Sequence, residues 1–112
     1  MALGYLPLLL VGLAGASWAD AETINVEQRG AVDLAPFVCQ DITRSSLVNR
    51  VCYDAANRTM IVQLNSVYSL HCGVPEAARD SFLNAPSMGQ YYNANIKGSG
   101  ATTPYQCEAR EF

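Results

Sequence analysis

The hydropathy pattern divides the chain into two unequal parts. Residues 3–13 are almost all apolar, interrupted mainly by glycine and proline, whereas apolar and polar residues are interleaved from residue 22 onwards. An interleaved pattern is typical of a globular domain. The first apolar run is well short of the roughly 20 residues that a membrane span requires. The pattern therefore predicts a leader over residues 1–21 and one folded domain after it.

The leader has the features of a cleavable signal peptide. Ala19 and Ala21 supply the small residues that precede a cut between Ala21 and Glu22. A cut after Ala19 competes with this one, and no lysine or arginine precedes the apolar run. We expect cleavage, and therefore a periplasmic or secreted protein. An uncleaved leader would instead tether the domain to a membrane.

Three β-strands are predicted in the middle of the chain. Residues 47–53, 59–64 and 67–72 are rich in β-branched and aromatic residues. A four-residue connection over 54–57 and a tight turn at 65–66 join them. Strands at this spacing predict an antiparallel meander.

Pairing the strands through these turns predicts which side chains share a face. The face expected to form the core carries Leu47, Val51, Met60, Val62, Leu64 and Val67. The second face carries Val48, Arg50, Cys52, Thr59, Ile61, Gln63, Tyr68, Leu70 and Cys72.

Two helices follow the predicted strands. Pro75 suits the first position of a helix that Pro86 ends. Ser87 is a good N-cap for a second helix, which runs through Ile96 and ends at Gly98.

The predicted fold class is α+β, with a three-stranded antiparallel β-meander and two α-helices packed on one face. Residues 22–44 carry few regular signals, so we expect an extended N-terminal arm there. Residues 45–112 form the domain, including its C-terminal tail.

Cysteine usage predicts two disulfides. The chain has four cysteines, all after the leader: Cys39, Cys52, Cys72 and Cys107. An even number in a small exported domain favours disulfides. A zinc site is the alternative, but it requires close pairs such as C-x₂-C, which are absent from the sequence.

The predicted strand register restricts the pairing of the cysteines. Cys52 and Cys72 would both lie opposite Thr59, so they are about 9–10 Å apart. A disulfide spans at most about 7 Å between Cα atoms. Each strand cysteine should therefore pair with Cys39 or Cys107, which would hold the arm and the tail over the second face.

The charge distribution argues against two classes of partner. The net charge is −3, and the seven lysines and arginines are scattered along the chain. Nucleic-acid binders usually concentrate basic residues on one face, and anionic membrane surfaces attract similar clusters. Both partners are disfavoured.

Catalytic chemistry has little support in the sequence. His71 is the only histidine and precedes Cys72, but adjacent strand residues point to opposite faces and the thiol is expected in a disulfide. No pair of carboxylates has a spacing that suggests acid–base chemistry. We expect a structural histidine, no enzyme activity, no metal and no cofactor.

A candidate binding surface is predicted from aromatic and polar residues near the second helix. Its members are Tyr68, Ser87, Gly89, Tyr91, Tyr92 and Asn93. The two tyrosines could stack on a nucleobase or a peptide, and the helix start could hold an anion. The alternatives are a tyrosine ring packed on the sheet and an ordinary serine cap.

Residues 45–97 resemble the KTSC domain, a short module found alone in bacteria and at the C-terminus of some lysyl-tRNA synthetases. The most specific block is Ala85-Pro86-Ser87-Met88-Gly89-Gln90-Tyr91-Tyr92-Asn93, which is similar to the family pattern A-x-S-x-G-x-[FY]-[FY]-N. Tyr53-Asp54 and Val74-Pro75 also fit. One departure is that the family's central Y-x-Y falls on Ser69 and His71, with Tyr68 one residue away from that register.

The resemblance implies a module whose function is not established, with RNA binding suggested by association. Together with the leader and the charge, it leads us to expect a small exported, non-catalytic protein that binds a protein or a cell-envelope component. An RNA-binding module is the alternative.

Overall fold

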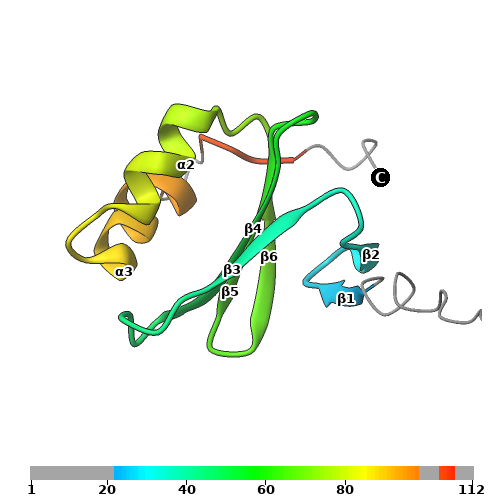
Figure 1. The fold of residues 1–112 in the computed structure, drawn as a ribbon, viewed down its shortest axis with the longest axis horizontal. Coiled ribbons are helices and arrows are strands. Elements are labelled where there is room, and N and C mark those ends of the chain that lie inside the picture. The colour runs from blue at the N-terminus through cyan, green and yellow to red at the C-terminus, as the bar shows by residue number, and fades with distance from the viewer. Residues whose placement is uncertain (1–21, 99–103, 108–112) are drawn as a thin grey trace, which may run out of the picture.

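The computed structural model describes residues 22–98 and 104–107. These residues form a six-stranded mixed β-sheet with helices on one side (Figure 1). The predicted signal peptide over residues 1–21 lies outside the described residues.

The predicted meander forms the centre of the sheet. Strands β4 (Val48–Asp54), β5 (Thr59–Leu64) and β6 (Val67–His71) pair antiparallel in sequence order. A sheet of only three strands is nevertheless a wrong prediction, because the strand order is β2-β1-β6-β5-β4-β3. The α+β class is confirmed.

The N-terminal arm supplies the three additional strands. These are β1 (Thr23–Val26), β2 (Gly30–Asp33) and β3 (Val38–Asp41). β3 pairs antiparallel with β4, and β1 pairs parallel with β6 at a single position, Val26 opposite Tyr68. The prediction of an arm without strands failed because each strand is only four residues long and its pairing comes from residues distant in the sequence.

The register of β4 on β5 differs from the prediction in two ways. Cys52 lies opposite Ile61 and not opposite Thr59, because β4 extends through Asp54. The Asp54 carboxylate accepts hydrogen bonds from the backbone amides of the following turn and so fixes the position of that turn. The resulting shift of two residues leaves the faces unchanged, because side chains alternate with a period of two.

A β-bulge causes the second difference. The register shifts between Val48 and Arg50, which leaves Asn49 as an extra residue. Val48 therefore turns to the core face, where it is fully buried, and Leu47 is only half-buried. Val67 was also expected in the core, but it is 46% exposed at the start of β6.

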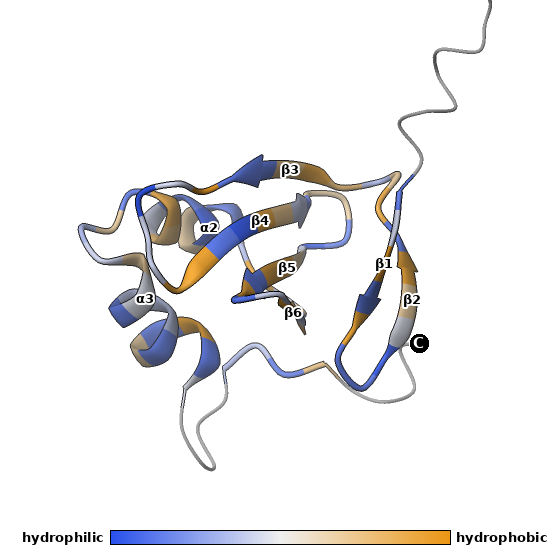
Figure 2. Ribbon diagram, turned by 90° about the horizontal axis from the view of Figure 1, so that it is seen from below, coloured by the Kyte–Doolittle hydropathy of each residue, from blue (hydrophilic) through white to orange (hydrophobic). Residues whose placement is uncertain are grey.

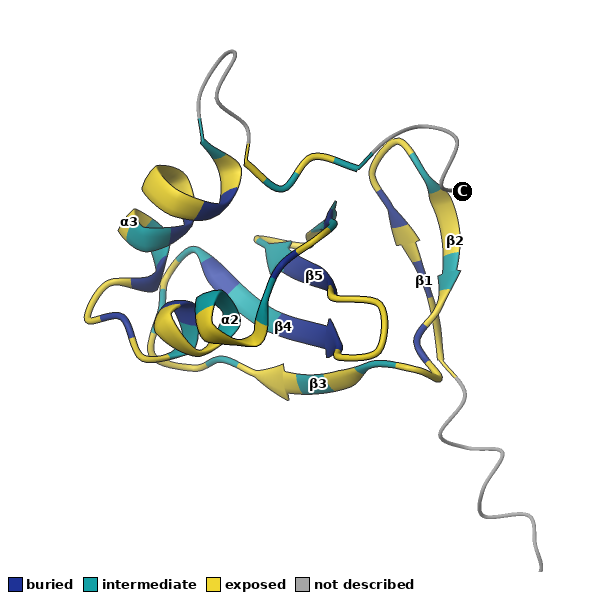
Figure 3. Ribbon diagram, turned by 90° about the horizontal axis from the view of Figure 1, so that it is seen from above, coloured by how far each residue is buried: buried dark blue, intermediate teal, exposed yellow. Residues whose placement is uncertain are grey.

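The meander has a hydrophobic core on each face (Figure 3). The core under the helices contains Val48, Val51, Tyr53, Met60, Val62, Val74, Phe82, Met88, Tyr92 and Ile96. The core on the second face contains Ile24, Val26, Leu34, Cys52 and Ile61. Seen from below (Figure 2), the hairpin of β1 and β2 lies across the meander from the helices. The arm therefore covers the second face, as predicted. The prediction that the tail also covers this face is wrong, because Tyr105 packs against the core under the helices.

The helical segment agrees well with the sequence pattern. Helix α2 (Glu76–Leu83) follows Pro75, and α3 (Met88–Tyr91) continues into the π-helix η2 (Tyr92–Lys97). The Ser87 hydroxyl accepts a hydrogen bond from the Gln90 amide at 3.3 Å, which confirms the predicted cap. Gly98 ends the segment with φ of 67°, a conformation that glycine tolerates best.

Two disulfides fix the arm and the tail. Cys39 bonds to Cys52 directly across β3 and β4, with Cα atoms 3.9 Å apart. Cys72 bonds to Cys107 in the tail, with Cα atoms 5.0 Å apart. The prediction that each strand cysteine pairs with an arm or tail cysteine is confirmed.

Candidate functional site

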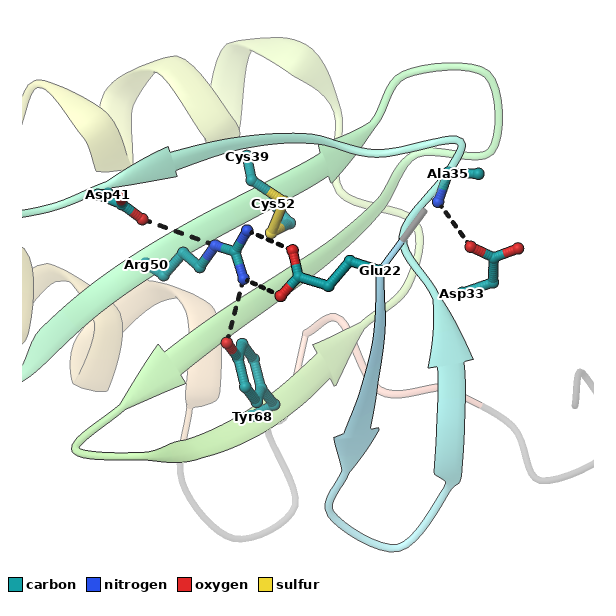
Figure 4. The surroundings of a disulfide bond; sticks show 8 residues. All are labelled: Glu22, Asp33, Ala35, Cys39, Asp41, Arg50, Cys52 and Tyr68. Carbon is teal, nitrogen blue, oxygen red and sulfur yellow. Dashed lines mark hydrogen bonds and ion pairs between the residues drawn. A yellow bond between two sulfur atoms is a disulfide. The ribbon is translucent and has the colours of Figure 1, made fainter. Parts of the chain in front are cut away.

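The residues of the predicted binding surface lie on opposite sides of the sheet. Tyr68 lies on the second face, where its hydroxyl accepts a hydrogen bond from Arg50 at 3.2 Å (Figure 4). Tyr91 and Tyr92 lie on the helix side. The six residues therefore do not form one surface.

Arg50 holds the arm to the meander. Its guanidinium donates two hydrogen bonds to the Glu22 carboxylate, at 2.9 and 3.0 Å, and lies 3.6 Å from a carboxylate oxygen of Asp41. The bonds to Glu22 and Tyr68 raise the pKa of Arg50, and the bond to Arg50 lowers the pKa of Glu22. Tyr68 is thus part of a structural contact that joins β4 and β6 to the start of the arm.

Three other predicted residues serve helix packing. Tyr91 stacks on Phe82 with ring centroids 6.0 Å apart. A Cβ atom at Gly89 would lie 3.4 Å from the Leu47 side chain, so the glycine permits close packing there. Ser87 is occupied by the cap. The alternatives of a packed tyrosine ring and an ordinary cap describe these residues.

Tyr92 and His71 form a buried polar pair. The Tyr92 hydroxyl lies 3.1 Å from Nε2 of His71, and the two rings meet edge to face at 5.4 Å. Burial lowers the pKa of His71 to about 4, so the imidazole is neutral at neutral pH. Burial raises the pKa of Tyr92, and a hydrogen bond from Ser69 opposes this rise. Because both side chains are uncharged at neutral pH, a hydrogen bond and not an ion pair joins His71 to Tyr92.

A cavity of about 450 Å³ lies over this pair. Its apolar end is formed by Leu47, Leu64 and Val67. Its polar lining consists of Glu27, Ser69, His71, Tyr92, Asn93 and Lys97. A second cavity, of about 230 Å³, shares Glu27, Ser69, His71 and Lys97 with the first. We call the two adjoining cavities the β6 groove.

Two segments outside the predicted site border the smaller cavity. The turn between β1 and β2 contributes Glu27, Gln28 and Arg29, and the tail contributes Tyr105, Gln106 and Cys107. No local sequence pattern indicates these residues, because only long-range packing places the arm and the tail beside β6. The sequence pattern could place only Ser69 and His71 together, because they lie two positions apart on one predicted strand and therefore face the same side.

Asn93 is the one predicted binding residue that is exposed and lines the groove. It lies on the π-helix η2, a type of helix that is rare and frequently found at functional sites. With Lys97 on the same helix, it adds two hydrogen-bonding side chains to the lining of the groove.

The residues that carry the family resemblance have clear structural tasks. The Tyr53 hydroxyl donates a hydrogen bond of 2.6 Å to the carbonyl of Val74, which ties β4 to the start of α2. Asp54 caps the turn after β4, and Tyr92 seals the core against β6.

Within residues 22–98 and 104–107, no group of three or more His, Cys, Asp or Glu side chains could hold a metal ion. In the same part of the chain, no helix has the length and apolar character needed to cross a membrane.

Comparison with known proteins identifies the family. A crystal structure of a KTSC domain protein from Yersinia pestis superposes with a TM-score of 0.52 at 31% identity, covering 56% of this chain and 89% of that one. No curated protein matches the chain. The sequence profile of the KTSC domain matches residues 44–99, which contain the meander, α2, α3 and η2. The chain therefore belongs to the KTSC domain family.

Proposed function

We propose that this protein is an exported, non-catalytic binding module that holds a segment of a partner protein in the β6 groove. The observation that carries the proposal is the composition of the groove, which joins an apolar end to a lining of hydrogen-bonding side chains. Protein–protein interfaces typically combine an apolar core with a polar, hydrogen-bonding rim. The two disulfides fit an oxidising compartment outside the cytoplasm.

The apolar end can supply binding energy. Val67 is one of two large apolar side chains that remain substantially exposed among the described residues. It lies beside Leu47 and Leu64, which are half-buried. Fully covering a side chain of this size stabilises a complex by about 1.5–3 kcal/mol.

A binding role fits the buried pair better than catalysis does. His71 is neutral, its Nε2 is engaged by Tyr92, and its neighbour Cys72 is in a disulfide. A general base needs a pKa near the working pH and a proton within reach. A pKa of about 4 makes His71 a weak base.

The alternative, RNA binding, has less support. The charged residues of the groove include Glu27 beside Arg29 and Lys97, and the whole chain is acidic. Without a concentrated basic face, affinity for a phosphate backbone should be weak. We expect no binding of single-stranded RNA at low salt.

Site-specific photocrosslinking tests the proposal. A photoreactive residue at Asn93 lies at the groove, whereas one at the exposed Ser81 of α2 serves as a control. Both proteins are exposed to an extracytoplasmic extract of the source cells. We expect a reproducible protein adduct at position 93 and none at position 81.

A pair of valine variants makes the result specific to the groove. Val67→Arg should lower the adduct yield at position 93 by roughly tenfold, the effect of losing about 1.4 kcal/mol of binding energy. Val38→Arg changes a strand valine outside the groove that is more exposed than Val67, at 75% against 46%, and should leave the yield unchanged. Equal yields in the two variants, or adducts to RNA alone, would contradict the proposal.

A further inference from the structure

Strand β6 has one edge that is only partly covered. β5 occupies the other edge along the whole strand. On the partly covered edge, the Glu27 amide bonds to the Tyr68 carbonyl at 2.9 Å, and the Cys72 amide bonds to the Tyr105 carbonyl at 2.9 Å. β1 therefore covers one end of this edge and the tail covers the other, and the tail runs past β6 on the side away from β5 (Figure 2).

The position between these two contacts is Leu70. In an antiparallel ladder, the main-chain groups of successive residues point alternately toward and away from the neighbouring strand. Because Tyr68 and Cys72 both bond away from β5, the Leu70 N–H and C=O must also point away from β5. The pairing of β1 with β6 is confined to Val26 and Tyr68. In the part of the chain that the structure describes, no strand pairs with Leu70 on this side.

The smaller cavity of the β6 groove lies at this position. Its lining includes Leu70, with the β1–β2 turn at one end and the tail at the other. It joins the larger cavity through Ser69 and His71, whose side chains contact Tyr92 of the helical segment. A chain segment beside Leu70 would thus place alternate side chains in the larger cavity.

We propose that the gap beside Leu70 takes an extended peptide segment of a partner protein, which adds to β6 by main-chain hydrogen bonds to the Leu70 N–H and C=O. The inference rests on the proposed function and specifies how the partner is held. Strand addition uses main-chain bonds for affinity and side-chain pockets for selectivity. The partner segment therefore needs an N–H at the paired position, which excludes proline, and an apolar side chain for the end formed by Leu47, Leu64 and Val67.

A second copy of this chain is the less suitable occupant. The gap is recessed between the β1–β2 turn and the tail, which both bond to β6. Two recessed edges cannot approach each other closely enough to share hydrogen bonds. A narrow peptide can enter such a gap.

Amide hydrogen exchange of the protein alone tests the premise. The amides of Ser69 and His71 bond to β5, so we expect slow exchange at both. The Leu70 amide should exchange faster than either by roughly a hundredfold or more. Slow exchange at Leu70, equal to that of its neighbours, would overturn the inference.

The binding test compares two variants at position 70. Leu70→Pro removes the outward N–H without breaking a bond to β5, and Leu70→Ala removes the same side-chain packing but keeps the N–H. The probe is a peptide selected on the wild-type protein from a phage-displayed library of random heptapeptides. We expect Leu70→Pro to bind it at least roughly tenfold more weakly than Leu70→Ala does.

A variant-independent measurement keeps the test decisive if Leu70→Pro does not fold. Single N-methylation is scanned along the selected peptide against the wild-type protein. We expect methylation at one position to cause most of the loss of affinity, because Leu70 is the open position between the β1 and tail contacts, and methylation of the two adjacent amides, which face away from β6, to have little effect. Equal losses at consecutive positions, or a heptapeptide library that gives no binder, would overturn strand addition.

The outcomes separate this inference from the proposed function. If the Asn93 crosslink persists but Leu70→Pro and Leu70→Ala bind equally, the groove binds a partner without strand addition. If the crosslink is absent as well, the proposed function fails. Concentration-dependent protection of the Leu70 amide without peptide would assign the edge to a second copy, which also overturns the inference.

Discussion

Burial determines the chemistry of individual residues in this protein. His71 and Tyr92 each carry an ionisable group, and burial of both groups favours the uncharged forms. Arg50 is different, because its partners Glu22 and Tyr68 favour its charged form. The same sheet thus holds an uncharged pair on one face and an ion pair on the other.

The His71 environment predicts a pH-dependent stability. Its pKa is 6.5 in the unfolded chain and about 4 in the folded protein. Between these values the unfolded chain binds a proton that the folded protein does not. The free energy of unfolding should therefore fall as pH drops from 6.5 to 4, by about 3 kcal/mol in total. Urea denaturation at several pH values measures this change.

The His71→Gln variant is the control. It removes the titrating group, so its stability should stay nearly level over the same range. Glu22 contributes in a separate window, because its lowered pKa means that its stabilisation is lost only as pH falls below 4.5. A wild-type profile that is flat between pH 6.5 and 4 would contradict the prediction.

At the scale of elements, the arm completes the sheet on both sides of the meander. β3 extends it beyond β4, and β1 with β2 extends it beyond β6. The attachment of β1 is slight, with one pair of residues in register. Contacts of Ile24 and Val26 in the second core and the Arg50–Glu22 pair therefore have to hold the hairpin in place.

Removal of the Arg50 guanidinium should loosen the hairpin selectively. In Arg50→Ala, we expect faster exchange of the Leu34 amide, which bonds to the Glu22 carbonyl. The amides of β5 should be unchanged, because β5 pairs with β4 and β6 in both proteins. Glu22→Gln keeps a hydrogen-bond acceptor and should give a smaller acceleration. Unchanged exchange at Leu34 in Arg50→Ala would show that the Arg50–Glu22 pair does not hold the hairpin in place.

For the whole molecule, the disulfides connect the family domain to its additions. Cys52 and Cys72 lie within the matched residues 44–99, whereas Cys39 and Cys107 lie outside them. Each bond therefore attaches one flanking segment to the meander. The sequence separations of 13 and 35 residues mean that the second bond closes the longer loop.

Loss of the Cys72–Cys107 bond should lower the free energy of unfolding more than loss of the Cys39–Cys52 bond, because the longer loop gains more chain entropy in the unfolded state. In the loop-closure model, the Cys72–Cys107 bond contributes about 4 kcal/mol and the Cys39–Cys52 bond about 3 kcal/mol. The double variant Cys72→Ser with Cys107→Ser should lower the free energy of unfolding by the larger amount, as measured by urea denaturation. The Cys72 amide should also exchange faster, because its acceptor is the Tyr105 carbonyl of the tail. Unchanged stability together with a protected Cys72 amide would show that the tail stays docked without the bond.

Local chemistry in the sequence determined much of this protein. The meander follows from β-rich segments separated by turn residues, and the helices follow from Pro75, Ser87 and Gly98. The absence of a Cys52–Cys72 bond followed from strand spacing even though the predicted register was two residues off, because Cys52 lies on β4 and Cys72 directly follows β6, two strands away. Which of the two bonds to Cys39 did not follow from the sequence and was decided by the pairing of β3 with β4.

The tertiary structure alone decided the rest. The arm strands are too short to have a periodic signal, and the bulge at Asn49 that turns Val48 inward depends on the β4–β5 pairing. The β6 groove joins the arm, β6, η2 and the tail, which are distant in sequence. Its composition could not be derived from any local pattern, because only long-range packing brings these segments to one strand.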